Sequence, residues 1–274
     1  MKLSFHIQPV NIDTTNADLF FEISAQGLSY IIIDNGICLA MVIYNFSEGT
    51  SDEAAVGYVH QVMADQPVLH QRFNKVHIIY GYAPSVLVPH QFMNDADSNA
   101  MLELVFGEAS ERVTRTDFMY RHAIHNVYAV PAVIEQVVTR YFGSADYTHQ
   151  ASLLPDVVKS AGNHLYCIFG TGRLKTLLLK EGKLQLMQNY WYKTAEDVSY
   201  QLLNQCKSFD MDTNEILVQL SGMIDASSGL YNELYKYFLQ VQFEPLPVQY
   251  QYPEAINQYP PHYFSHLFAI AACV

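Results

Sequence analysis

Two stretches of the chain decide the fold, Leu19–Phe46 (LFFEISAQGLSYIIIDNGICLAMVIYNF) and Leu165–Tyr192 (LYCIFGTGRLKTLLLKEGKLQLMQNYWY). Each holds three β-prone runs separated by glycine-containing turns, the signature of consecutive antiparallel hairpins. An internal repeat of this size predicts a duplicated structural unit. The two stretches align without a gap at an offset of 146 residues, with identical residues at Leu19/Leu165, Leu28/Leu174, Gly36/Gly182, Met41/Met187 and Tyr44/Tyr190.

The same order of elements follows each stretch. Helices predicted to open at Ser51 and Thr194 begin with a hydroxyl residue and carboxylates, which satisfy free amides and suit the helix dipole. An apolar strand ending in glycine comes next, Val76–Gly81 in the first copy and Ile216–Gly222 in the second, and a helix, a short strand and a further helix follow. This is the order of an RNase H-like unit. We therefore predict an α/β protein with duplicated RNase H-like domains arranged as in actin-like ATPases, in which mixed five-stranded sheets are flanked by helices.

The repeat also sets the predicted domain boundaries. The first RNase H-like domain covers residues 1–162 and the second covers residues 163–274. The first copy carries an extra segment, about residues 82–130, between its fourth strand and second helix. Strand-like runs at 85–88, 114–122 and 126–130, with a helix near 98–106, predict an inserted subdomain beside the first core.

The segment Glu244–Pro261 is rich in proline and tyrosine and follows neither a helical nor an alternating pattern. Segments of this kind run extended. We interpret it as a strap that crosses the second domain and delivers the final helix. The alternative is an aromatic ligand for the groove of a partner protein.

Composition excludes several classes of partner. The formal net charge of −12 and the lack of lysine and arginine clusters argue against binding nucleic acid. No apolar run is long enough for a membrane helix or a signal peptide, so membrane insertion is not expected and a cytoplasmic location is. The four cysteines are widely scattered, as buried free thiols commonly are.

The whole chain resembles an uncharacterised bacterial family, a domain of unknown function with an actin-like ATPase fold. The resemblance rests on Leu87–Pro89, Asn189–Asp197, Tyr200–Leu203, Ser221–Ile224 and Tyr259–Phe264. These motifs imply no known chemistry. At the level of the fold the chain is also similar to pilus-assembly and secretion proteins that use an actin-like body as a scaffold.

Actin-like ATPases hold phosphate and metal at an Asp-x-Gly turn between the first two strands of each repeat. The internal alignment places these turns at 24–27 and 170–173, and neither contains aspartate. Asp34 lies one turn later, in Asp-Asn-Gly, which predicts a type I′ hairpin turn. The adenosine-binding element of the family, a strand with paired glycines, corresponds to Leu220–Met223, where one glycine of the pair is missing.

The remaining candidates for nucleotide contact are few. The turn amides of Gly170, Thr171 and Gly172 could face an anion, and the resemblance adds Ser221 and Gly222. We expect a degenerate nucleotide site without catalytic residues, cofactor or bound metal.

Nuclease and metal chemistry find little support in the sequence. An RNase H-type nuclease needs several carboxylates converging on two metal ions, one of them on the first strand, and only Glu22 lies there. His122 and His125 lie three residues apart near a predicted hairpin, and His262 and His266 lie four apart on the last helix, where they could share a zinc ion, but the zincin motif is absent. We interpret them as surface or packing histidines.

Biological role does not follow from the sequence. The prediction is a non-catalytic binding or scaffold protein that receives another protein or a peptide, at the cleft between its halves or at an exposed sheet edge. The alternative is a divergent nucleotide-binding enzyme, ATPase or phosphotransferase-like, whose metal-binding groups have moved to Asp225, Glu196 or Glu53. A small-molecule sensor is a third possibility.

Overall fold

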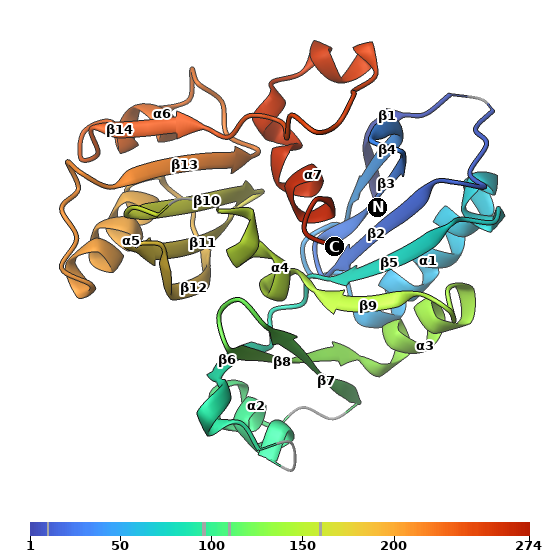
Figure 1. The fold of residues 1–274 in the computed structure, drawn as a ribbon, viewed down its shortest axis with the longest axis horizontal. Coiled ribbons are helices and arrows are strands. Elements are labelled where there is room, and N and C mark those ends of the chain that lie inside the picture. The colour runs from blue at the N-terminus through green and yellow to red at the C-terminus, as the bar shows by residue number, and fades with distance from the viewer. Residues whose placement is uncertain (10, 95–96, 109–110, 159–160) are drawn as a thin grey trace. The chain divides into compact units, whose positions relative to one another are not determined.

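The computed structural model describes residues 1–9, 11–94, 97–108, 111–158 and 161–274 (Figure 1). The chain forms two compact units, Met1–Ser152 with Gln249–Ile256, and Leu153–Val248 with Asn257–Val274. Positions 95–96 and 109–110 of the predicted insertion, and 159–160 before the predicted boundary, lie outside the described residues. The division into domains 1–162 and 163–274 stays a prediction.

The sheet of the first unit has six strands in the order β1-β4-β3-β2-β5-β9. The pairs β1–β4, β4–β3 and β3–β2 are antiparallel, whereas β5 is parallel to β2 and β9 is parallel to β5. The strands are β1 (Lys2–Ile7), β2 (Asp18–Ser24), β3 (Gly27–Asp34), β4 (Ile37–Asn45), β5 (Lys75–Tyr80) and β9 (Asp146–His149). The predicted count of five strands was wrong for this sheet because β1 precedes the repeated stretch and has no counterpart in the second copy.

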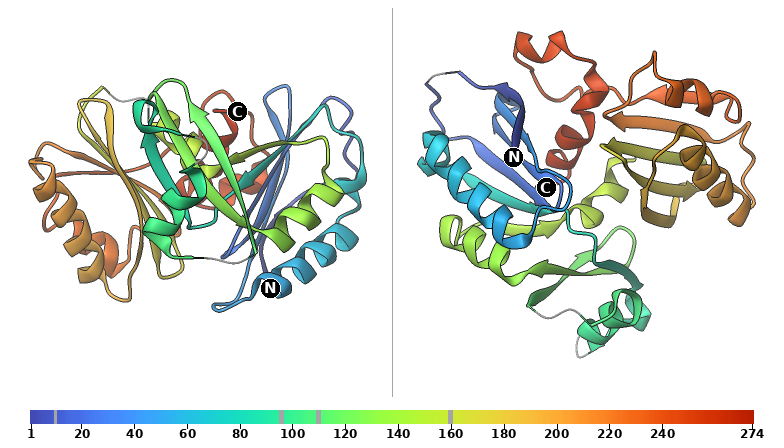
Figure 2. Two further views of the ribbon diagram at one scale, coloured as in Figure 1. Left: turned by 90° about the horizontal axis from the view of Figure 1, so that it is seen from below. Right: turned by 180° about the vertical axis from the view of Figure 1, so that it is seen from behind.

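Two helices cover one face of this sheet and lie side by side (Figure 2). They are α1 (Asp52–Asp65) and α3 (Ala132–Tyr141), and their apolar faces pack on Leu19, Phe21 and Ile23 of β2. Helix α1 begins where predicted, because the hydroxyl of Ser51 accepts a hydrogen bond from the amide of Ala54 at 3.2 Å. A 3-10 turn, Pro67–His70, follows α1, and α4 (Gln150–Val157) begins in the first unit and ends in the second.

The predicted insertion forms a separate three-stranded sheet of order β6-β8-β7, with one α-helix packed on it (Figure 1). The buried Leu102 of the helix packs against Val88, Val127 and Ala129 of the sheet. The elements are β6 (Ser85–Pro89), the 3-10 turn His90–Phe92, α2 (Ser98–Phe106), β7 (Arg112–Met119) and β8 (Ile124–Pro131). The elements predicted within residues 82–130 are thus present.

The sheet of the second unit has the order β12-β11-β10-β13-β14, which is the order of the first sheet without β1. Its strands are β10 (His164–Gly170), β11 (Arg173–Lys180), β12 (Lys183–Trp191), β13 (Leu217–Gly222) and β14 (Gln240–Phe243). Its α-helices are α5 (Ala195–Ser208), α6 (Gly229–Leu234) and α7 (Ser265–Ala271), and a 3-10 turn covers Pro261–Tyr263. Another 3-10 turn, Glu254–Gln258, begins in the first unit and ends in the second. A capping box between Thr194 and Asp197 opens α5, as the sequence predicted.

The duplication extends to small irregularities of the strands. The second and third strands of each copy shift register once, between Ile32 and Ile33 in the first and between Leu178 and Leu179 in the second. These positions are 146 residues apart, the offset of the sequence repeat. The two sheets are therefore copies of one structural unit, down to the position of a bulge.

The Asp34 turn has the predicted type I′ form. Asn35 and Gly36 both have positive φ, at 46° and 82°, and Glu181 and Gly182 repeat this at 52° and 72° in the second copy. Such values are those of a tight hairpin connection. Asp34 thus belongs to a turn between the second and third strands.

The proline-rich strap lies elsewhere than predicted. Its middle part, Gln249–Ile256, packs within the first unit. Gln251 donates its amide to the carbonyl of Gly36 at 2.8 Å and accepts the amide of Cys38 at 2.9 Å. Strand β1 pairs with β4 no further than Met41, so the start of β4 has backbone groups to offer the strap.

Candidate functional site

The turns that the repeat assigns to phosphate are short connections between paired strands. In the first copy, the amide of Gln26 donates to the hydroxyl of Ser24 at 3.2 Å. In the second copy, Tyr192 donates its amide to the carbonyl of Gly172 at 3.0 Å and its hydroxyl to the carbonyl of Gly170 at 3.1 Å. Tyr192 therefore fixes the second turn from the neighbouring strand end.

Arg173, which follows this turn, lies against an aromatic ring. Its guanidinium carbon is 3.3 Å from the centre of the Trp191 ring, a cation–π arrangement. The positive charge nearest the turn is thus stacked on a side chain of β12.

Ser221 is the penultimate residue of β13 and is fully buried. Its hydroxyl lies 2.8 Å from the hydroxyl of Ser265, 3.1 Å from Nδ1 of His266 and 3.1 Å from the carbonyl of His262. All three partners belong to the C-terminal part of the same chain. A hydroxyl offers one donor and two acceptor positions, so these contacts use its capacity.

Gly222 is glycine for a reason that needs no ligand. Its φ is +81°, and a Cβ at this position would lie 2.3 Å from the carbonyl oxygen of Phe169 on β10. The next amide, that of Met223, donates to the same carbonyl at 2.7 Å. The close approach of β13 and β10 therefore excludes any side chain here. Nucleotide binding at Gly170, Thr171, Gly172, Ser221 and Gly222 stays a prediction.

A buried carboxylate lies beside Ser221. Glu244 accepts a hydrogen bond from the hydroxyl of Tyr166, and the nearby hydroxyls of Ser221 and Ser265 act to lower the pKa of its carboxyl. Burial raises the pKa of Glu244, and burial with the nearby carboxylate raises the pKa of Tyr166. These side chains satisfy one another and hold the C-terminal segment on the end of β13.

The histidine pair of the last helical segment does not converge on one point. His262 donates from Nε2 to the carbonyl of Ile224 at 2.7 Å and stacks on Phe243 with 3.9 Å between ring centres, whereas His266 meets Ser221. Burial lowers the pKa of His262. Both are packing histidines, as the sequence predicted.

In the second histidine pair, His125 lies beside two other rings. His125 lies 2.8 Å from His90 between ring nitrogens, and its ring is 4.6 Å from that of Phe118. In the described part of the chain, no three histidine, cysteine, aspartate or glutamate side chains gather in a way that could hold a metal ion.

The carboxylates considered for a displaced metal site have local roles. Glu53 and Glu196 lie in the first turns of α1 and α5, where negative charge suits the helix dipole. Asp225 accepts hydrogen bonds from Ser227 at 3.3 Å and from Tyr263 at 3.4 Å. Glu22, the candidate of the first strand, accepts from the side-chain amide of Gln150 at 3.2 Å.

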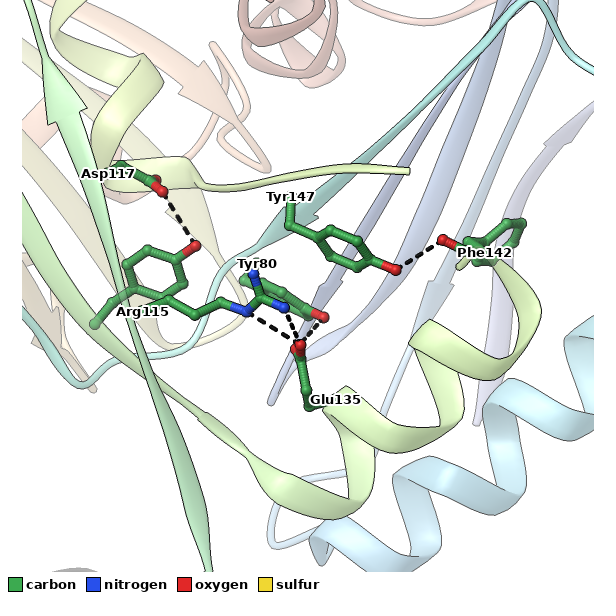
Figure 3. Close-up of polar contacts among 7 residues, drawn as sticks. Tyr80, Arg115, Asp117, Glu135, Phe142 and Tyr147 are labelled. Carbon is green, nitrogen blue, oxygen red and sulfur yellow. Dashed lines mark hydrogen bonds and ion pairs between the residues drawn. The ribbon is translucent and has the colours of Figure 1, made fainter. Parts of the chain in front are cut away.

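A second polar cluster, which the sequence did not suggest, joins the inserted sheet to the first core (Figure 3). The buried Glu135 of α3 accepts a 2.5 Å hydrogen bond from Tyr80 of β5 and two from the guanidinium of Arg115 on β7. Arg115 also lies 4.8 Å above the ring of Tyr147 on β9. We name Glu135, Arg115 and Tyr80 the Glu135 anchor.

Asp117, two residues along β7, makes a second connection. Its carboxylate accepts hydrogen bonds from Tyr128 at 3.2 Å, Thr148 at 3.0 Å, the amide of His149 at 2.8 Å and Ser152 at 2.5 Å. Its donors thus come from β8, from β9 and from the start of α4. Residues at i and i+2 of a strand share a face, so Arg115 and Asp117 together were the available sequence signal.

The described donors of these two carboxylates come from β5, β7, β8, β9 and α4, so both carboxylates connect the inserted sheet to the first core. Burial and the Glu135 carboxylate raise the pKa of Tyr80, which keeps this phenol protonated. The two carboxylates hold the inserted sheet in one place against the first core.

The inserted subdomain exposes apolar side chains on its helix. At the end of α2, Leu104 is 88% exposed, Val105 58% and Phe106 46%. We name these three residues the α2 patch. Exposed apolar residues in consecutive positions are typical of interaction surfaces when they gather on one element.

A family model matches residues 8–241, and its description is a protein of unknown function, DUF3822. The chain belongs to the DUF3822 family. The predicted resemblance to a domain of unknown function is thereby confirmed, and membership of DUF3822 carries no activity with it. No curated protein matches the sequence.

Solved structures similar to this DUF3822 member share its fold. One is a protein of unknown function with an actin-like ATPase fold from Bacteroides thetaiotaomicron VPI-5482, with 14% identity, 95% of this chain and 97% of that chain covered, and a TM-score of 0.78. A PilM–PilN type IV pilus biogenesis complex gives 13% identity, 93% and 96% coverage and a TM-score of 0.62.

A third relative is the ethanolamine utilization protein EutJ from Carboxydothermus hydrogenoformans, at 10% identity, 94% and 90% coverage and a TM-score of 0.50. The predicted actin-like fold is confirmed by these matches, and at such identities they show the fold alone. No helix within the described ranges of this DUF3822 chain has the length and hydropathy that a bilayer span requires.

Proposed function

We propose that this protein is a non-catalytic binding or scaffold protein, which uses an actin-like fold to hold another protein in the cytoplasm. The observation that carries the proposal is the set of hydrogen bonds at Ser221. The hydroxyl that would face a nucleoside in an actin-like ATPase is bonded to Ser265, His266 and the carbonyl of His262. The phosphate turns of both copies also lack aspartate.

Two further features support binding rather than catalysis. The Glu135 anchor and Asp117 fix the inserted sheet. Because the sheet is already fixed, a partner that binds the α2 patch does not have to order it, and binding costs less conformational entropy. PilM, a structural relative, was solved in a complex with PilN. Cys38, Cys167 and Cys206 are buried free thiols, which suits a reducing compartment such as the cytoplasm.

Nucleotides are expected to leave the thermal stability of the protein unchanged. A nucleotide present at 100 times its dissociation constant would stabilise the folded chain by about 2.7 kcal/mol. The midpoint of thermal unfolding is measured with and without Mg-ATP, Mg-GTP and their non-hydrolysable analogues. Each nucleotide is used at about 1 mM, which is about 100 times a dissociation constant of about 10 μM. A saturable rise of the midpoint with any of them would establish nucleotide binding and favour the enzyme alternative.

Charge on the α2 patch is expected to abolish partner capture while leaving the fold intact. Leu104→Asp with Val105→Asp places two carboxylates on an exposed surface, where substitutions usually change the stability by about 0.5 kcal/mol or less. The measurement is crosslinking of the tagged protein in cells, with proteins recovered by wild type and variant compared.

The matched control is Leu239→Asp, which adds a carboxylate at another exposed leucine. The expected result is a partner that wild type and the control recover and that the α2 variant does not. Equal recovery by all three proteins would remove the α2 patch from the proposal.

A further inference from the structure

The edge of the third strand differs between the two copies of the duplicated unit. In the first copy, β1 lies along β4 as an antiparallel partner, with Phe5 opposite Ile43 and Ile7 opposite Met41. Strand β4 therefore has a neighbour on both sides. A short extended segment is thus known to fit this edge of the repeated unit.

Strand β12 is the counterpart of β4, since both of its ends lie 146 residues beyond those of β4. It is the outermost strand of the second sheet (Figure 1). Within the ranges that the structure describes, β11 is its one strand partner. Among the described residues, the second copy thus has no strand in the place that β1 holds in the first.

The backbone amides and carbonyls of β12 point alternately toward β11 and toward the open edge. Tyr192 donates its amide toward β11, to Gly172. Successive residues of an antiparallel strand turn their amides and carbonyls to opposite sides. The outer side of β12 therefore carries the backbone amides and carbonyls of Met187, Asn189 and Trp191. Their counterparts in the first copy are the residues of β4 that lie opposite Ile7, Phe5 and Lys2 of β1.

The sequence of β12 does little to protect this edge. Open edges are usually guarded by charged side chains, proline or a bulge. From Leu184 to Trp191 there is neither a charged residue nor proline. The bulge lies toward the start of the strand, and the first copy has the same bulge while pairing with β1.

Charge near the edge indicates which segment would fit. Residues 173–193 contain five basic residues and one acidic residue, so the β11–β12 hairpin and its flank carry 5 − 1 = +4 in a chain of net charge −12. Lys183 and Lys193 are exposed and flank the strand at its two ends. Pairing of two β12 strands would bring like charges together, whereas an acidic segment is attracted.

We propose that the outer edge of β12 binds an extended, acidic peptide segment as an added antiparallel strand along Met187–Trp191. The proposal deepens, and rests on, the function proposed above. Backbone hydrogen bonds supply the pairing, and Lys183 and Lys193 select for acidic flanks. The segment takes on the second copy the place that β1 holds on the first.

The probe is a phage-displayed library of random ten-residue peptides, panned against the full chain at low salt. Enriched peptides are expected to have apolar residues at every second position and glutamate or aspartate near their ends. They are then synthesised with a fluorescent label, and their affinity is measured by anisotropy. Failure to enrich any peptide, or enrichment without acidic residues, contradicts the proposal.

Asn189→Pro tests the pairing itself. Proline removes the outward amide and is tolerated in edge strands where the amide faces solvent. The expected result is at least a tenfold loss of peptide affinity, about 1.4 kcal/mol, with the circular dichroism spectrum retained. Equal affinity for wild type and a folded Asn189→Pro variant would overturn the proposal.

A charge variant keeps the test valid if the proline variant fails to fold. Lys183→Glu with Lys193→Glu should weaken the acidic peptides about tenfold at low salt, and added salt should reduce the difference, since screening acts within about 10 Å at 0.1 M. The matched control is Lys207→Glu, an exposed lysine of α5. Equal weakening by the control would show a non-specific charge effect.

Self-pairing has its own signature. Light scattering that shows a dimer of the wild type, lost in Asn189→Pro, would replace the peptide proposal with pairing of two copies. The outcomes also separate this inference from the proposed function. If wild type and Asn189→Pro recover the same partner in the crosslinking experiment, the binding function stands and the β12 edge is not its site.

Discussion

Gly222→Ala is expected to destabilise the second unit by about 3 kcal/mol or more. The added Cβ would lie 2.3 Å from the carbonyl oxygen and 3.0 Å from the amide nitrogen of Phe169, both backbone atoms of β10. Positive φ costs an alanine about 1–2 kcal/mol, and overpacking costs about 1–3 kcal/mol. Relief of the clash requires β10 and β13 to separate, although they are neighbours at the centre of the sheet.

The single tryptophan makes this loss easy to follow, because Trp191 lies on β12 of the same sheet. Urea unfolding monitored by its fluorescence gives the free energy of unfolding. Gly229→Ala is the matched control, since nothing lies within 4 Å of a Cβ there and the residue is the first of α6. The control should keep wild-type stability. A Gly222→Ala protein within about 1 kcal/mol of wild type, the lower limit of the positive-φ cost, would contradict the described approach of β13 to β10.

Glu135→Ala is expected to loosen the inserted sheet and to cost about 2–3 kcal/mol. Removal of one member of a buried ion pair leaves the other charge without a partner, which commonly costs about 3–5 kcal/mol. The side chain of Arg115 is 32% exposed, so water can solvate part of its charge and the loss falls below that range. The hydroxyl of Tyr80 also loses its acceptor.

A double-mutant cycle with Arg115→Met and Glu135→Leu tests the coupling within the Glu135 anchor. The double variant should be more stable than the sum of the single changes predicts, because it leaves no charge unpaired. Hydrogen exchange measured by mass spectrometry should show faster exchange in β7 and β8 for Glu135→Ala. Glu103→Ala, on the exposed surface of α2, is the control. Additive single effects would show that the two side chains are independent.

The order of elements could be predicted from the sequence because the duplicated stretches constrain each other. A turn such as Asp34-Asn35-Gly36 is ambiguous alone, but its alignment with Glu181-Gly182 fixed its place between the second and third strands. Strand β1 lay outside the repeat and so escaped this comparison. The strap was misplaced because its docking depends on backbone groups of β4 that no sequence pattern marks.

The polar clusters were harder to foresee for a physical reason. Glu135, Arg115 and Tyr80 come from α3, β7 and β5, and their meeting depends on where the inserted sheet packs. Periodicity describes single elements and gives no information on contacts between distant ones. The partners of Ser221 likewise come from more than 40 residues along the chain, at His262, Ser265 and His266.

The hydrogen bonds of the Ser221 hydroxyl within the chain bear on how complexes of this protein would be regulated. A protein whose shape depends on bound nucleotide can be reset by hydrolysis, and so responds to the energy supply of the cell. Here covalently attached groups fill the capacity of that hydroxyl, and they can be neither exchanged nor consumed. Under the proposed function, complexes of this protein are expected to form and dissolve by mass action, with their lifetime set by the off-rate of the partner.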